Sequence, residues 1–231
     1  DGVGLLLIVE KYPWANTLDV THGVEKALAE IKPGLPDVDI DHTIFRPATF
    51  IEISMDNLSR AFLIGCVLVI MVLIAFLYEW RVALISIISI PLSLIAAGMV
   101  LYWQGASINT MVLAGFVIAL GSVVDDAIID VENIVRRLRQ HRREGSSKST
   151  ARIILEASLE VRPAILHATL IAVAALIPVF FLDGLSGAFF KPLAAAYVLA
   201  LMASMLVALT VTAGLSLIML KNAPLTRRES P

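Results

Sequence analysis

Five long apolar segments constrain the fold of this chain more than any other feature of its sequence. Each is 18 to 28 residues long, and about 20 residues of helix cross the roughly 30 Å hydrocarbon core of a bilayer. Hydrophobic residues make up 58% of the chain and charged residues only 16%, whereas soluble proteins average about 45–50% and about 25%. The sequence therefore predicts an α-helical polytopic membrane protein with a transmembrane bundle over residues 60–221. The five predicted transmembrane helices are residues 61–78, 82–103, 108–135, 164–182 and 193–220.

Residues 1–59 lack such apolar runs and predict a different kind of structure. The stretches "GLLLIVEKY" (4–12) and "VDIDHTIFR" (38–46) are typical of β-strands. Residues 17–31 between them have apolar residues at helical spacing, with Thr17 as the expected N-cap. The order predicts an α+β fragment, a β-α-β piece too small to bury a complete core alone. A basic start followed by a long apolar region is missing, so no signal peptide is predicted.

Lys and Arg residues collect in three places along the chain. If the five helices cross the membrane in alternating directions, all three places lie on the same side. Positive charge in short loops favours the cytoplasm, so this side is predicted to hold a cytoplasmic loop, 136–163, and a cytoplasmic tail, 222–231. Residues 1–59 would then lie on the opposite side. A basic loop beside a membrane favours contact with anionic lipid headgroups rather than with nucleic acid. The three places are Arg81, the loop 136–163 with its seven Arg and one Lys, and the segment from Lys221 to Arg228.

The third apolar segment carries four carboxylates in eight positions, Asp125, Asp126, Asp130 and Glu132. Asp130 and Glu132 are expected to reach the cytoplasmic interface and be solvated, whereas Asp125 and Asp126 are expected inside the hydrocarbon. A charge at mid-membrane costs about 2.5–3.5 kcal/mol on insertion scales, and adjacent carboxylates repel each other, which favours the protonated form of at least one. A carboxylate that binds a proton on one side of the membrane and releases it on the other can couple substrate transport to the flow of protons. Asp125 and Asp126 are therefore the predicted proton relay.

A structural alternative is that these aspartates only hold helices together through salt bridges. Polar contacts between membrane helices more often use Ser, Thr or Asn, which favours the relay. Small residues on the same helix (Ala114, Gly115, Ala119 and Gly121) would let a neighbouring helix pack closely.

Enzymatic chemistry is not predicted, because no nucleophile–base pair, phosphate-binding loop or metal-ligand spacing occurs in the sequence. No cofactor is predicted and no metal site is assigned. Six of the seven Met residues lie in apolar segments, where Met ordinarily fills gaps in the packing. His167 is expected to be buried in the fourth segment, where a hydrogen-bonded structural role is favoured over a role in proton transfer.

The segment "INTMVLAGFVIALGSVVDDAIIDVENI" (108–134) resembles the fourth transmembrane helix of resistance–nodulation–division (RND) efflux transporters. The hallmark of that helix is a G-x-x-x-D-D run followed by E-N, and the sequence has Gly121, Asp125, Asp126, Glu132 and Asn133 at those positions. Five further stretches resemble the family in the same order, so the likeness covers the whole chain. They are "WANTLDV", "EWR", "IPLSL", "GLSGAFFKPL" and "SMLVALTVT".

The resemblance implies a fragment from the N-terminal half of a longer permease. Residues 1–59 would be the end of a periplasmic porter subdomain, and the five helices would be helices two to six. It also implies a homotrimeric proton antiporter of the bacterial inner membrane that works with a periplasmic adaptor and an outer-membrane channel. A lysine on a helix of the absent second half would pair with Asp125 and Asp126, and the predicted spans contain no lysine themselves. Gly121, Asp130, Glu132 and Asn133 would support the relay.

The run "DDAIIDVENIVRRLR" is similar to the heavy-metal efflux branch of the family, which implies metal cations as substrate. Three alternatives stay open. The protein could export drugs or other hydrophobic compounds, it could be a relative that translocates lipid or protein, or it could be a non-transporting membrane scaffold whose acidic helix only binds partner subunits.

Overall fold

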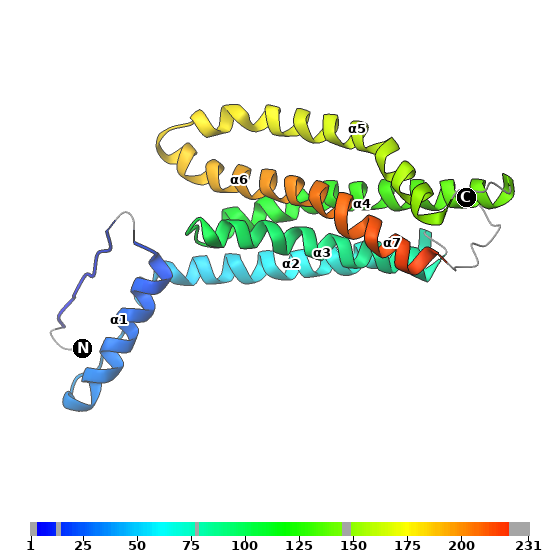
Figure 1. Cartoon of the computed structure of the whole chain (residues 1–231). Helices are drawn as coiled ribbons and strands as arrows, with labels where there is room; N and C mark the ends of the chain where they lie inside the picture. The colour runs from blue at the N-terminus through cyan, green and yellow to red at the C-terminus, as the bar shows by residue number, and fades with distance from the viewer. Residues whose placement is uncertain (1–3, 13–14, 77–78, 145–148, 222–231) are drawn as a thin grey trace. The chain divides into compact units, whose positions relative to one another are not determined.

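Seven α-helices account for most of the regular structure in the computed structural model (Figure 1). The structure describes residues 4–12, 15–76, 79–144 and 149–221. Shorter 3₁₀ or π turns join some of the helices. The elements are α1 (Thr17–Ile31), η1 (Lys32–Gly34), α2 (Pro47–Phe76), α3 (Trp80–Trp103), α4 (Thr110–Glu144), α5 (Thr150–Leu176), η2 (Ile177–Phe181), α6 (Gly184–Val207), η3 (Ala208–Thr212) and α7 (Ala213–Leu220).

Contacts divide the chain into two units, residues 1–57 and residues 58–231. The first unit contains α1, which begins where the side chain of Asn16 accepts a hydrogen bond from the backbone N–H of Leu18 at 2.9 Å. An Asn side chain at this position satisfies one of the free N–H groups of the first turn. The predicted helix over 17–31 is therefore present, but its N-cap is Asn16 rather than Thr17.

The predicted strands at 4–12 and 38–46 are wrong, because the described residues contain no β-strand. The α+β fold expected for residues 1–59 is corrected to helix and irregular chain. A strand is stabilised by hydrogen bonds to a neighbouring strand and by burial of one face. The apolar side chains from Leu5 to Val9 are instead 63–86% exposed. The β-branched and other apolar residues of these segments are typical of strands, but no pairing partner lies beside them in the described part of the unit.

Ion pairs around Arg46 hold α1 against the start of α2 within this first unit. The Arg46 guanidinium donates to Glu25 of α1 at 2.6 Å and to Glu52 of α2 at 2.6 Å. The hydrogen bond from Arg46 holds the pKa of the Glu25 carboxyl below its usual value. His22 lies 3.2 Å from Glu52, and this contact adds a second link between the two helices.

The second unit is a helical bundle in which α4 and α6 each contact several neighbours. Helix α4 packs against α3, α5 and α6, and α6 also packs against α3 (Figure 1). Five segments of the described chain, the first of which begins in the first unit, are long and apolar enough to cross a membrane, as the sequence predicts. These segments are Pro47–Ile74, Trp80–Trp103, Thr110–Glu144, Thr150–Phe181 and Gly184–Leu220.

The helices extend further than the apolar runs that predicted them. Helix α2 begins at Pro47 rather than near residue 61, and α4 continues to Glu144. Helix α5 begins at Thr150, where the hydroxyl of Ser149 accepts from the backbone N–H of Arg152. Much of the predicted loop 136–163 is therefore helical, since Arg, Leu, Glu and Ala are good helix formers even outside apolar runs. The predicted tail, 222–231, lies outside the described residues.

Pro91 and Pro178 have different effects on the helices that contain or precede them. Helix α3 continues through Pro91 without a break. Helix α5 ends at Leu176, and Pro178 lies in the 3₁₀ turn η2 that follows. A proline lacks the N–H for the helical hydrogen bond and clashes with the carbonyl of the preceding turn, which explains why the regular helix stops there.

Small residues bring α4 and α6 close together. A Cβ added to Gly115 of α4 would lie 2.5 Å from the backbone oxygen of Leu193 and 2.9 Å from the Cβ of Ala196, both in α6. Ala119 of α4 and Ala200 of α6 are fully buried in the same core. The predicted role of small residues in close helix packing is thus seen at Gly115. Gly121 differs, because a Cβ added there would meet nothing within 4 Å.

A π turn, η3, joins α6 to α7. Its last residue, Thr212, is fully buried and shares a hydrogen bond of 2.9 Å with the Ser89 hydroxyl of α3. This contact satisfies two polar side chains inside an otherwise apolar interface, as buried polar groups require.

Candidate functional site

The four clustered carboxylates, residues 125–132, lie on α4, a helix whose two ends are well defined by the sequence. At the start, the Asn109 side chain accepts a hydrogen bond from the backbone N–H of Val112 at 2.9 Å. At the end, His141, Arg142 and Arg143 occupy the last turn, where positive charge is favourable for the helix dipole. The helix has 35 residues, about 52 Å at 1.5 Å per residue. Asp126 lies close to its midpoint, sixteen residues after Thr110 and eighteen before Glu144.

Asp125 and Asp126 are adjacent in sequence but face different surroundings. Asp126 is half-buried and faces α6, where the Ser204 hydroxyl donates to its Oδ2 at 3.4 Å. Asp125 is exposed in the described chain. Successive residues of a helix are rotated by about 100°, which explains why one carboxylate faces α6 and the other does not.

Asp125 belongs to an uncovered face of α4. Residues at positions three or four apart share a helix face, and every member of this stripe is exposed in the described chain. The face includes Gly121, where an added Cβ would meet no other atom within 4 Å. It also includes two carboxylates, and charged groups are unusual on a surface in contact with lipid alone. The stripe consists of Ile118, Gly121, Asp125, Ile129, Glu132 and Arg136.

Asp130 is buried, so the prediction that it is solvated at the interface is wrong. Its side chain is 2% exposed and faces α5, on which Ser158 is also buried and Arg162 carries the opposite charge. The sequence predicted Arg162 as part of a cytoplasmic loop. Because α5 begins at Thr150, Arg162 instead lies in the fourth turn of that helix. Burial of Asp130 therefore depends on the docking of α5, which local sequence patterns do not report.

Asn133 joins α4 to α5 next to Asp130. Its Nδ2 donates to the backbone oxygen of Ala157 at 2.8 Å, and its Oδ1 accepts from Arg136 at 2.6 Å. Glu132, one residue earlier, is exposed on the open face. The structure thus brings Asp126, Asp130 and Asn133 into the packed bundle, whereas Asp125, Glu132 and Gly121 lie outside it.

Two residues of this site, Ser204 and Ser158, were not identified from the sequence. Both are small polar residues on the buried faces of apolar helices. Hydroxyl groups at such places often bond to a polar group on a neighbouring helix, and that signal was available. Their partners lie 78 and 28 residues away along the chain, however, so the sequence alone gave no reason to pair them with α4.

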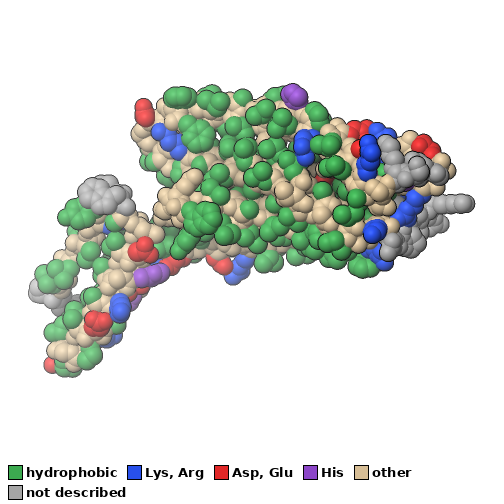
Figure 2. Space-filling view, viewed as in Figure 1, with side chains coloured by type: hydrophobic (Ala, Val, Ile, Leu, Met, Phe, Trp, Pro, Cys, Tyr) green, Lys and Arg blue, Asp and Glu red, His purple; other side chains and the backbone are tan. Residues whose placement is uncertain are grey.

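Basic side chains gather at the end of the bundle where α4 ends and α5 begins (Figure 2). Arg139 of α4 lies 3.2 Å from Glu79, which precedes α3. Arg81 of α3 donates to the backbone oxygen of Met219 at 3.1 Å, and Arg142 of α4 donates to that of Leu220 at 3.2 Å. Three segments that the sequence predicted on one side of the membrane are therefore in contact. Lys148, Arg227 and Arg228, also used in that prediction, lie outside the described residues.

His167 does not occupy the buried place predicted for it. Its side chain is exposed on α5, and its Nδ1 is hydrogen-bonded to the backbone oxygen of Pro163 one turn earlier. The ring thus contacts the backbone of its own helix, four residues earlier. The contact is local to α5 and does not link His167 to the acidic residues of α4.

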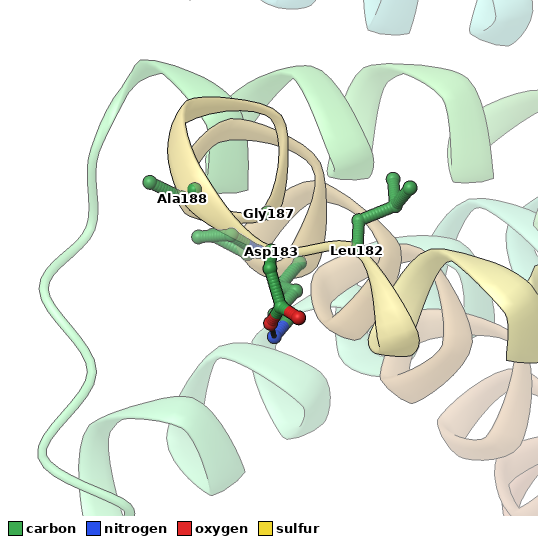
Figure 3. A pocket seen from close by; sticks show the side chains of 7 residues that line it. Leu182, Asp183, Gly187 and Ala188 are labelled. Carbon is green, nitrogen blue, oxygen red and sulfur yellow. Dashed lines mark ion pairs between the residues drawn. The ribbon is translucent and has the colours of Figure 1, made fainter.

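A shallow hollow of about 330 Å³ lies at the start of α6 (Figure 3). It is lined by the two residues that follow η2, Leu182 and Asp183, and by the first turns of α6, where Lys191 forms an ion pair with Asp183 at 3.9 Å. Since α6 begins at Gly184, Lys191 lies within this helix, although the predicted span from residue 193 left it outside. Among the residues that the structure describes, no group of three or more His, Cys, Asp or Glu side chains is arranged to hold a metal ion.

Five apolar helices of spanning length, one with carboxylates at its middle, define a multi-pass membrane protein of the transporter class. The sequence profile of the AcrB/AcrD/AcrF family matches residues 2–230. The chain therefore belongs to this family of RND efflux transporters, which confirms the resemblance found in residues 108–134. Members of the family are secondary transporters of the inner membrane and not enzymes.

The relatives include a cation efflux protein, a multidrug resistance protein and a swarming motility protein. The chain is 36% identical to the cation efflux system protein CusA of Escherichia coli K12 over 201 residues, 85% of this chain and 19% of that protein. It is 31% identical to the multidrug resistance protein MdtC of Pectobacterium atrosepticum over 228 residues, 98% of this chain and 21% of that protein. It is 30% identical to the swarming motility protein SwrC of Bacillus subtilis over 233 residues, 99% of this chain and 22% of that protein. The chain thus spans about a fifth of the length of these relatives.

Proposed function

We propose that the protein containing this chain is a proton-coupled efflux antiporter of the bacterial inner membrane, with Asp125 and Asp126 as its proton-binding groups. The observation that supports this most directly is the pair of adjacent carboxylates at the middle of α4. One of them faces Ser204 within the bundle, and the other lies on a face that the described helices leave uncovered. Carboxylates at such a depth in a membrane helix are costly and generally functional.

The open face of α4 is where we propose that another helix of the longer protein docks. A lysine on that helix would compensate the ionised forms of Asp125 and Asp126. When protons bind, this attraction is lost, and the contact between the two helices changes. Gly121 would permit close approach at this contact, because no side chain fills the space beside it. Glu132 lies on the same face and would extend the contact, whereas Asn133 fixes α4 to α5.

The distribution of charge supports an orientation for the bundle. The end that carries Arg81, Arg139 and Arg142 would face the cytoplasm, because Lys and Arg in short connections are retained there. Residues 1–57, which precede the membrane-spanning part of α2, would then be periplasmic. Protons would reach Asp125 and Asp126 from the periplasmic side and leave toward the basic end.

Heavy-metal cations are the proposed substrate, since the chain is more similar in sequence to a cation efflux protein than to the multidrug relative. The protein would act as a homotrimer with a periplasmic adaptor and an outer-membrane channel, and its basic end would contact lipid headgroups. Efflux of hydrophobic compounds is the second candidate, because the likeness to the multidrug relative extends over nearly the whole chain.

The test uses the full-length protein in liposomes with an acidic lumen and a pH-sensitive dye inside. Adding a soft metal cation outside should cause protons to leave the lumen, and Asp126→Asn should reduce this flux on the order of 100-fold, as expected for loss of an acid–base group. Glu156→Gln is the matched control, because Glu156 is an exposed carboxylate paired with Arg152 on α5. Replacing the metal by a hydrophobic cationic dye tests the second candidate.

Two results would contradict the proposal. Proton flux that persists in Asp126→Asn would exclude this carboxylate as a coupling group. A variant that assembles normally and also keeps the cellular phenotype would instead support a scaffold, which needs the acidic helix only for binding.

A further inference from the structure

Asp130 differs from every other charged residue that the structure describes, because it alone is fully buried. It lies one helical turn after Asp126, and Asn133 lies on the same stripe another turn further. Residues four apart on a helix are neighbours on its surface. Two carboxylates therefore follow each other along α4 in the direction of the basic end, the first half-buried against α6 and the second fully buried against α5.

The surroundings of Asp130 leave part of its hydrogen-bonding capacity unused. Its Oδ2 is buried and has no hydrogen-bond partner in the described part of the chain. The same is true of Nε of Arg162, which is also buried. The two groups have opposite charge and lie on helices that pack against each other. A buried carboxylate and a partly buried guanidinium, each with a buried atom left unpaired, are costly to keep unless they have a function.

The groups that face Asp130 come from both helices of this interface. On α5 they are Ser158, which is buried, and Arg162, whose positive charge attracts the carboxylate. On α4 the group is Asp126, one helical turn before Asp130, whose negative charge repels it. One positive group and one further carboxylate thus face Asp130, so a single proton shared between Asp126 and Asp130 would leave one net negative charge opposite one positive charge.

We propose that Asp130 is a second proton-carrying residue, which takes the proton from Asp126 and passes it along the α4–α5 interface toward the basic end. Arg162 is the positioning residue that stabilises Asp130 while it is ionised. This inference rests on the proposed function, because it extends the path that begins at Asp125 and Asp126.

The transfer is balanced in atoms and charge. Protonated Asp126 gives its proton to the Asp130 carboxylate, either directly or through one bridging water. The O–H bond at Asp126 breaks, an O–H bond forms at Asp130, and Asp126 becomes the carboxylate. Asp130 then gives the proton to water at the basic end and pairs again with Arg162. One proton crosses in each cycle, and both carboxylates return to their first state.

A purely structural ion pair is the alternative, and a double variant separates the two roles. Asp130→Asn, Arg162→Gln and their combination are made in the full-length protein, with Glu156→Gln as the exposed control. Thermal stability in detergent and proton flux in liposomes are measured for each. Asp130→Asn alone leaves Arg162 uncompensated and should lower stability, and Asp130→Asn with Arg162→Gln should recover it. Proton flux should stay reduced, on the order of 100-fold, in both.

Recovery of both stability and flux in the double variant would overturn the proposal, and so would an unchanged flux in Asp130→Asn. If that variant does not fold, Asp130→Glu keeps a carboxylate at the site. Its transport should persist with a displaced pH profile, and an unchanged profile would also overturn the proposal. Asp126→Asn is measured in parallel. If Asp126→Asn abolishes flux and Asp130→Asn does not, only the inference fails. If neither affects flux, the proposed function fails.

Discussion

Substitution of Gly115 by alanine should destabilise the bundle, although alanine is normally the better helix former. The added Cβ would lie 2.5 Å from the backbone oxygen of Leu193 and 2.9 Å from the Cβ of Ala196. An ordinary contact begins near 3.4 Å, so α4 and α6 would have to separate by about 0.9 Å at this point. The main obstacle is a backbone atom, which cannot rotate away as a flexible side chain could.

The size of the effect follows from two opposing contributions. Overpacking a tight core costs about 1–3 kcal/mol, and the upper end applies here because the backbone of α6 must move. The helix gains about 1 kcal/mol when alanine replaces glycine. The net result is a loss of about 2 kcal/mol.

Gly98→Ala is the matched control, since Gly98 lies inside α3 and a Cβ there would meet nothing within 4 Å. It should be neutral or slightly stabilising. Both variants of the full-length protein are heated in detergent, and the temperature at which half of the protein remains monodisperse on size-exclusion chromatography is compared. Equal temperatures for the two variants would refute the argument that α4 and α6 are in direct backbone contact.

Three further predictions concern single contacts. Asn16→Ala should destabilise α1 by about 1 kcal/mol, because the helix loses its N-cap. The backbone amides of the first turn should then exchange hydrogen faster, and an unchanged exchange rate would contradict the capping role. Thr212→Val should cost about 0.6–1.7 kcal/mol, the range for membrane hydrogen bonds, and its combination with Ser89→Ala should cost less than the two singles together; simple additivity in thermal unfolding would argue against the bond. Because Arg46 lowers the pKa of Glu25, their contact contributes stability above the ordinary pKa of glutamate and loses it as pH falls through the lowered value. Spin-label distances between α1 and the start of α2 should therefore lengthen in acid, and less so in Arg46→Gln, where the contact is already absent.

The sequence predicted the number of membrane helices because each apolar run exceeds the length that a bilayer requires. It did not predict their ends. Residues 47–60 and 136–144 are polar but continue the helices, since intrinsic propensity and end capping rather than hydrophobicity decide where a helix stops. The two strands failed for a different reason. A strand depends on a partner that is distant in sequence, and the unbroken apolar run from Leu5 to Val9 cannot supply one.

The candidate site was predictable as a set of carboxylates but not as an arrangement. Asp125 and Asp126 are conspicuous because they interrupt an apolar run. The burial of Asp130 depends on α5, and the hydrogen bond to Asp126 comes from Ser204 on α6. These contacts join segments whose relative placement is set by packing of the whole bundle, for example by the close approach at Gly115.

The π turn between α6 and α7 changes how this last helix tolerates insertions and deletions. A π turn contains about one residue more than an α turn, so loss of one residue between Ala208 and Thr212 would convert it into regular helix. Residues beyond it, such as Ser216 and Leu220, would keep their inward orientation. A deletion elsewhere in the α6 or α7 segments would rotate all following side chains by about 100° and expose this buried face. Chain length can therefore vary by one residue within η3 at little cost to the packing of α7.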